Sequence, residues 1–167
     1  MSTHRLSIYL ASPYGFTDAG REFMKNTMIP AIQNDRFELL NPWEVFDTIS
    51  QRIKKINALN SIKKQKQSFK LLNKKIAFAN EKMLNRVEIM VAILDGSDVD
   101  SGVASEIGYA YAKGKKIIGY RSDFRLTGDD LGAIVNVQVE YWINASGGSI
   151  VTNLSQLQKR LLQCLDI

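Results

Sequence analysis

The chain has 167 residues, of which 45% are hydrophobic and 23% charged, with a formal net charge of +5. This length and composition suit one globular domain. A single cysteine, Cys164, excludes an internal disulfide, and a single histidine, His4, excludes a zinc site built from several such ligands. We also discount catalytic triads that depend on His4 beside the N-terminus. No apolar run reaches the roughly 20 residues of a membrane span, and no signal peptide is evident, so we expect a cytoplasmic protein.

The N-terminal part of the chain predicts two strands separated by a helix. Arg5–Ala11 has the composition of a short buried strand. Thr17 is a plausible helix cap, and apolar positions extend that helix to about Gln33, with Pro30 predicting a kink or an early end. Phe37–Leu40 is the second expected strand.

The C-terminal part predicts three further strands. Glu88–Leu94 is a near-continuous apolar run, which is typical of a strand buried on both faces. A helix rich in small residues is expected over 102–112, followed by a strand at Lys116–Tyr120. Asn136–Trp142 alternates like an edge strand, and Leu154–Leu165 has the spacing of a closing amphipathic helix.

Strands and helices therefore alternate along the chain. This order predicts an α/β fold with a doubly wound, mostly parallel five-stranded sheet and helices on both faces, Rossmann-like or flavodoxin-like. We expect residues 1–167 to form one domain, with a lysine-rich helical insertion at about 48–79.

The net positive charge of the chain comes from that insertion. No acidic residue occurs between Asp47 and Glu81. The same stretch holds nine basic residues: Arg52, Lys54, Lys55, Lys63, Lys64, Lys66, Lys70, Lys74 and Lys75. The remaining chain carries 13 basic and 17 acidic residues. Within the insertion, isoleucines and leucines recur every three or four positions, which favours a solvated helix pair over a nucleic-acid-binding arm.

Acidic residues are concentrated after the strand at Glu88–Leu94. In such sheets ligands bind beyond the carboxyl ends of the strands. There the sequence places Asp95, Asp98 and Asp100 in a loop and Glu106 early in the next helix. We expect the helix dipole to keep such a carboxylate ionised.

Two readings of these carboxylates remain open. An ionised carboxylate can attack a sugar C1 while a second carboxyl, such as Asp100, handles the proton of the leaving group. Alternatively, the aspartates cap the helix and fill a turn, and Glu106 is solvated. The usual nucleotide motifs, GxGxxG and GKS or GKT, are absent.

Several collinear segments carry a family resemblance. They are Ile8–Pro13, Asn80, Asp95–Gly96, Asp100–Gly102, Glu106–Ala110 and Val135–Gln138. Together they resemble the nucleoside 2-deoxyribosyltransferases over about residues 6–138. The resemblance implies cleavage of a base from a 2′-deoxynucleoside, a deoxyribosyl group held on a glutamate, and its transfer to a second base with retention.

The resemblance also implies roles for individual residues. Glu106 matches the family's nucleophile, and Tyr9 matches the tyrosine that orients it. Asp100 matches an aspartate placed near the base, which is a candidate for protonating the leaving ring. Asn80 falls where members carry Asp or Asn and would position the base or the sugar.

Further binding residues follow from the same resemblance. Asn136 and Gln138 match a segment that the family lends to the neighbouring subunit's site, where the asparagine contacts the sugar 5′-hydroxyl. The resemblance therefore implies a homo-oligomer, either a dimer or a multiple of dimers. It also implies a role in nucleoside salvage. The remaining candidate substrate contacts are Ala11, Tyr14, Phe16, Asp95 and Gly102, of which Tyr14 and Phe16 either enclose the base or simply pack.

Two other functions are weighed against transfer. Relatives of this fold hydrolyse deoxynucleoside 5′-monophosphates through the same glutamate, and Ser12, Ser101 and Arg121 offer a possible phosphate cluster. A non-catalytic module that senses a nucleotide or binds nucleic acid through the lysine-rich helices is the weaker alternative. For the transferase we expect neither a metal ion nor an organic cofactor.

Overall fold

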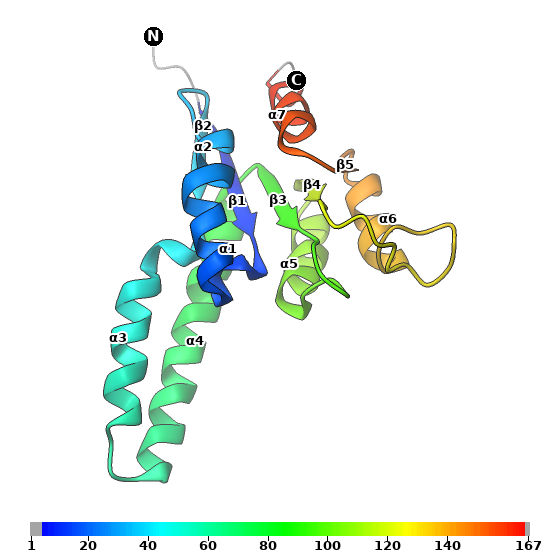
Figure 1. Ribbon diagram of the computed structural model, residues 1–167. Coiled ribbons are helices and arrows are strands. Elements are labelled where there is room, and N and C mark those ends of the chain that lie inside the picture. The colour runs from blue at the N-terminus through cyan, green and yellow to red at the C-terminus, as the bar shows by residue number, and fades with distance from the viewer. Residues whose placement is uncertain (1–4, 166–167) are drawn as a thin grey trace.

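A five-stranded parallel sheet forms the centre of the structure, a computed structural model that describes residues 5–165 (Figure 1). His4 lies outside the described residues. The strands are β1 (Leu6–Ala11), β2 (Phe37–Leu40), β3 (Ile89–Ile93), β4 (Lys116–Tyr120) and β5 (Ser149–Val151). All four neighbouring pairs are parallel, so the predicted α/β sheet is confirmed and is entirely parallel rather than mostly so.

Helices connect the strands on both sides of the sheet. The longer ones are α3 (Phe46–Asn57), α4 (Ile62–Arg86), α5 (Ser101–Ala112), α6 (Val137–Ala145) and α7 (Leu154–Leu162). Shorter helical segments are the 3-10 turns η1 (Pro13–Phe16) and η3 (Pro42–Val45), α1 (Asp18–Phe23), the π-helical turn η2 (Met24–Met28) and α2 (Ile29–Ile32).

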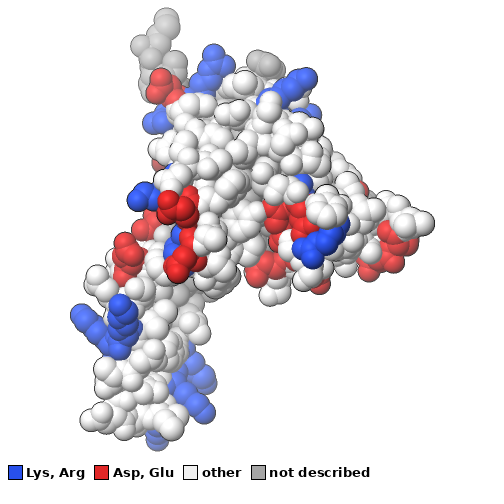
Figure 2. Space-filling model, viewed as in Figure 1, with Lys and Arg blue, Asp and Glu red and all other residues white. Residues whose placement is uncertain are grey.

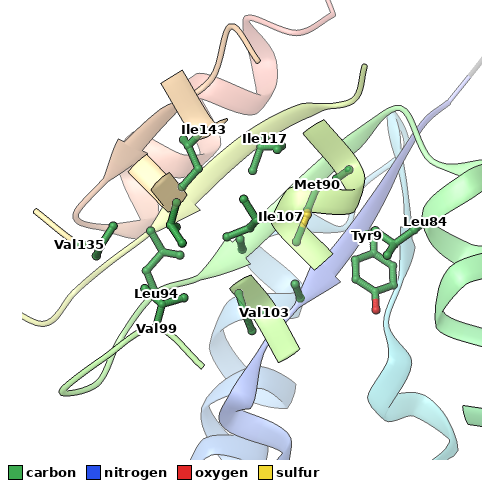
Figure 3. Close-up of a cluster of buried hydrophobic side chains, with 14 of the residues drawn as sticks. Tyr9, Leu84, Met90, Leu94, Val99, Val103, Ile107, Ile117, Val135 and Ile143 are labelled. Carbon is green, nitrogen blue, oxygen red and sulfur yellow. The ribbon is translucent and has the colours of Figure 1, made fainter. Parts of the chain in front are cut away.

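Alternating side chains of the central strands pack into two separate cores. Tyr9, Met90 and Ile117 face one core, which α4, α5 and α6 cover with residues such as Leu84 and Ile107 (Figure 3). The intervening residues of the same strands face the second core, which α1, η2, α2 and α7 cover. A strand buried on both faces must be apolar throughout, which explains the continuous apolar run at β3.

The strand order decides where the loops meet. The order is β2-β1-β3-β4-β5, the flavodoxin-like arrangement, in which ligands bind where the order reverses, between β1 and β3. The segments that follow β1, β3 and β4 all leave the sheet at its carboxyl edge, as the sequence predicted.

The first helix is irregular for a reason visible in the sequence. Thr17 caps it, because its hydroxyl accepts a hydrogen bond from the Gly20 amide at 3.0 Å. Pro30 has no N–H with which to continue an α-helical ladder. The preceding turn widens instead, with the Ile29 amide donating to the Met24 carbonyl, and the helix then continues to Ile32. The irregularity predicted at Pro30 thus takes the form of a π-helical turn, and the helix ends at Ile32.

The predicted edge strand over Asn136–Trp142 is wrong, because this segment forms α6. The Asn136 side chain accepts hydrogen bonds from the Gln138 and Val139 amides and so caps a helix. Val139 and Ile143, four residues apart, are the buried positions, which is a helical and not a strand period. The fifth strand is the three-residue β5, beyond the Gly147–Gly148 turn.

Helices α3 and α4 pack against each other as a long hairpin that projects from the sheet (Figure 1). This confirms the predicted helix pair, with bounds wider than 48–79. Lysines and arginines, without acidic neighbours, occupy its outer part (Figure 2). Among residues 5–165, no helix is long and apolar enough to cross a membrane.

Candidate active site

Glu106 is held at the carboxyl edge of the sheet by two neighbouring side chains. It lies in the second turn of α5, and its Oε1 accepts a hydrogen bond of 2.6 Å from the Tyr9 hydroxyl. The Asn80 amide, from α4, donates to the same oxygen at 3.4 Å. Tyr9 lies 97 positions and Asn80 26 positions before Glu106 in the sequence, yet both contact its carboxylate.

Burial controls the ionisation of this pair. The pKa of Glu106 is raised, chiefly because burial disfavours its charged form and also because Asp100 carries a like charge, whereas the Tyr9 and Asn80 hydrogen bonds oppose the rise. The pKa of Tyr9 is also raised, by burial and by the Glu106 charge, so its phenol remains a hydrogen-bond donor.

Asp100 has a structural role at the start of α5. Its Oδ1 accepts a hydrogen bond of 3.0 Å from the Val103 amide and caps the helix. A β-carbon at Gly102 would lie 3.0 Å from that oxygen, so a side chain there would crowd the cap. Asp98 similarly accepts from the Val99 amide at 2.7 Å. The helix-capping interpretation is therefore confirmed for Asp100, while Glu106 is half-buried and lines a cavity.

A cavity of about 380 Å³ opens beside Glu106. Its polar lining residues are Ser12, Asn80, Asp100 and Glu106. The others are Phe16, Pro42, Trp43, Phe46, Ile49, Ile53, Ile76, Gly102 and Val103. A mostly apolar cavity with a few convergent polar groups is typical of a small-molecule site.

Sequence reasoning missed most of the apolar side of this cavity. Phe46, Ile49 and Ile53 come from α3, where their helical spacing indicated only packing. Trp43 also lines the cavity. Its ring contacts Phe16 edge-on, and its Nε1 donates to the Ser12 carbonyl at 2.8 Å.

Asp95 joins the three loops at the sheet edge. It accepts hydrogen bonds from the Tyr14 hydroxyl, from the Ser122 hydroxyl at 2.6 Å and from the Asp123 amide at 2.8 Å. The Tyr14 ring packs edge-on against Phe23. Neither Asp95 nor Tyr14 lines the cavity, although both were substrate-contact candidates.

Arg121 supports these loops from below rather than offering a phosphate site. Its side chain is only 2% exposed and donates to the carbonyls of Leu94, Gly96 and Arg125, the last at 2.7 Å. Arg125 in turn forms an ion pair with Asp123, and this pair holds the pKa of Asp123 well below its usual range.

The other predicted contacts do not line the cavity within this chain. Ala11 is buried at the end of β1. Asn136 and Gln138 lie exposed at the start of α6, where Asn136 serves as the helix cap. Among the residues that the structure describes, no group of three or more His, Cys, Asp and Glu side chains is placed to hold a metal ion.

The sheet order and the half-buried carboxylate at its switch point are those of an α/β protein with a candidate small-molecule site. A family model for nucleoside 2-deoxyribosyltransferase matches residues 8–138. The chain belongs to this family, which confirms the resemblance read from the motifs.

Solved structures are similar in fold over nearly the whole chain. A conserved protein from Enterococcus faecalis V583 shares 25% identity with a TM-score of 0.69, covering 95% of this chain and 98% of its own. A 2-desoxiribosyltransferase from Leishmania mexicana shares 20% identity, with a TM-score of 0.60 and coverage of 90% and 93%. A 2-deoxyribosyltransferase from Bacillus psychrosaccharolyticus shares 16%, with a TM-score of 0.57 and coverage of 91% and 90%. No protein with a curated description matches the sequence.

Proposed function

We propose that the protein transfers a 2-deoxyribosyl group between nucleobases, with Glu106 as the nucleophile. The observation that carries this proposal is the Tyr9–Glu106 hydrogen bond of 2.6 Å beside a base-sized apolar cavity, in a chain of this family. A phenol that cannot easily ionise holds one carboxylate oxygen and stabilises its charge. We assign the attack to the other oxygen, Oε2.

The reaction proceeds in two displacements at the anomeric carbon. In the first, Oε2 of Glu106 bonds to C1′ of the deoxynucleoside, and the C1′–N bond breaks with its electrons and a proton going to the leaving base. In the second, a nitrogen of the incoming base bonds to C1′, loses its proton, and releases the carboxylate. Two inversions give overall retention.

We assign to Asp100 the transfer of a proton to the leaving base. One of its oxygens is engaged by the Val103 amide, and its charge is close enough to act on Glu106. Asn80 cannot take this role, because an amide is not a proton-donating acid at neutral pH. We instead assign Asn80 to orienting Glu106 and the sugar.

Two further features support a nucleoside substrate and a shared site. No Lys or Arg lines the cavity among the described residues, which favours a free 5′-hydroxyl over a 5′-phosphate. Asn136 and Gln138 are exposed on α6, accessible to a second copy. We propose a homo-oligomer in which they complete the partner's site, acting in cytoplasmic nucleoside salvage and without nucleic acid.

The test follows nucleosides and free bases by chromatography. The protein is incubated with deoxyinosine or thymidine, with and without adenine. We expect deoxyadenosine to form only when adenine is present. Glu106→Ala should abolish turnover, whereas Glu38→Ala, an exposed glutamate on β2 outside the cavity, should leave it unchanged.

Each other outcome assigns a different function. Release of free base without an acceptor would identify a hydrolase, and deoxynucleoside 5′-monophosphates would then be compared as substrates. No turnover, together with salt-sensitive binding of DNA or RNA, would favour the binding module. Ordinary transfer by Glu106→Ala would show that another residue is the nucleophile.

A further inference from the structure

The α3–α4 hairpin supplies one wall of the cavity beside Glu106. We name the side chains of Phe46, Ile49, Ile53 and Ile76 the hairpin wall. On α4, Ile76 lies one turn closer to the hairpin tip than Asn80, and on α3, Ile53 lies one turn beyond Ile49. The cavity therefore becomes wholly apolar as it extends from the carboxylate toward the hairpin tip.

The polar groups that line the cavity are engaged close to Glu106. The Ser12 hydroxyl accepts from the Tyr14 amide at 3.1 Å, the Asn80 amide donates to Glu106, and Asp100 caps α5. The hairpin wall contains no side-chain donor or acceptor. An amino or carbonyl group of a base that points toward this wall loses its hydrogen bonds to water and gains none.

We infer that the protein prefers nucleobases that carry an apolar substituent, an alkyl or aryl group on the exocyclic amine, seated against the hairpin wall. This inference rests on the proposed function, because it takes the cavity beside Glu106 to be the base site. One methylene group in an apolar pocket changes acceptance by about 10- to 200-fold. A group the size of a benzyl ring should therefore be favoured over hydrogen by at least about tenfold.

A second cavity of about 380 Å³ continues the same space between α3 and α4. It shares Pro42, Ile49, Ile76 and Asn80 with the first and extends to Leu72 and Met83. Glu44, Arg52 and Lys75 also border this second cavity. The two isoleucines thus separate the base site from further volume that has apolar side chains at Leu72 and Met83. Ile49→Ala should open this partition and extend acceptance to longer alkyl groups.

The test compares adenine with N6-benzyladenine as acceptors from a common donor, thymidine. We expect kcat/KM for N6-benzyladenine to exceed that for adenine by about tenfold or more in the unaltered protein. Ile53→Asn, which places an amide in the hairpin wall, should reduce this ratio about tenfold. Ile62→Asn is the matched control, because Ile62 is 71% exposed and lines neither cavity.

The outcomes separate this inference from the proposed function. Equal use of the two bases, a preference for adenine, or a ratio that Ile53→Asn leaves unchanged would overturn the inference while leaving transfer intact. If neither base accepts deoxyribose, the proposed transfer fails. The affinities of the two bases, measured by calorimetry, then decide: tighter binding of N6-benzyladenine supports the apolar site, and equal, weaker or undetectable binding overturns it.

Discussion

Replacing Tyr9 by Phe removes a single hydroxyl from the pair that holds Glu106. The ring is fully buried against the α4–α5 face of the sheet, so the phenylalanine keeps that packing. The lost bond of 2.6 Å joins a phenol to a carboxylate, and such bonds contribute about 1.5–3 kcal/mol. If this energy serves the transition state, turnover falls about 10- to 100-fold.

The pH profile should change in the same variant. The Tyr9 hydrogen bond lowers the pKa of Glu106 against the raising effect of burial. Without it the pKa rises further, so a larger fraction of Glu106 is protonated at a given acidic pH. The acid limb of kcat/KM therefore moves to higher pH, and the activity loss is larger in acid than in alkali.

The assay is steady-state deoxyribosyl transfer measured across the pH range for the protein and two variants. Tyr111→Phe provides the matched control, since its ring packs between Tyr141 and Trp142, away from the cavity. It should keep the original rate and pH profile. A Tyr9→Phe protein with unchanged turnover and an unmoved acid limb would refute the positioning role of Tyr9.

Two predictions concern stability. Because burial raises the pKa of Glu106 in the folded state, that state holds the proton more tightly than the unfolded chain, and stability falls as pH rises through the window from the ordinary to the raised pKa. Glu106→Gln should therefore raise Tm at neutral pH. This gain in Tm should vanish in acid, below the ordinary glutamate pKa. A lower Tm for the variant at neutral pH would contradict this reasoning. A β-carbon at Gly15 would lie 1.8 Å from Trp43, so Gly15→Ala should cost about 1–3 kcal/mol in denaturant unfolding. Gly132→Ala, in the exposed loop, should cost much less, and equal losses would argue against the Trp43 contact.

The sheet was predictable wherever a strand is buried on both faces. The buried positions of β1, β3 and β4 form apolar runs that are visible in the sequence without any partner, and the polar Ser7 and Lys116 lie at half-buried positions near strand starts. β5 has only three residues and no such run. The α6 segment misled because Val135, Val137 and Val139 alternate like a strand, although Val137 is half exposed and the helix depends on the Asn136 cap.

The candidate site was predictable where chemistry requires a particular residue type. Glu106 and Tyr9 are identified by motifs, and the structure brings them together. The apolar spacing of α3 shows that the helix covers something, but not that its inner turns face a cavity. Asp95 likewise resembles a ligand-binding carboxylate in sequence, because loop-joining and ligand-binding aspartates both occur at the edge of a sheet.

Helix α4 runs without a break from the cavity to the hairpin tip, and its two ends have different roles. Its inner end carries Asn80 to Glu106, while its outer end is a lysine-bearing rod closed by Gln65, which donates to the carbonyls of Asn57 and Leu59. Removing the whole α3–α4 hairpin would remove the hairpin wall from the cavity. Shortening or replacing the tip would keep the hairpin wall in place. The outer turns can therefore vary in length and charge, whereas the inner turns cannot.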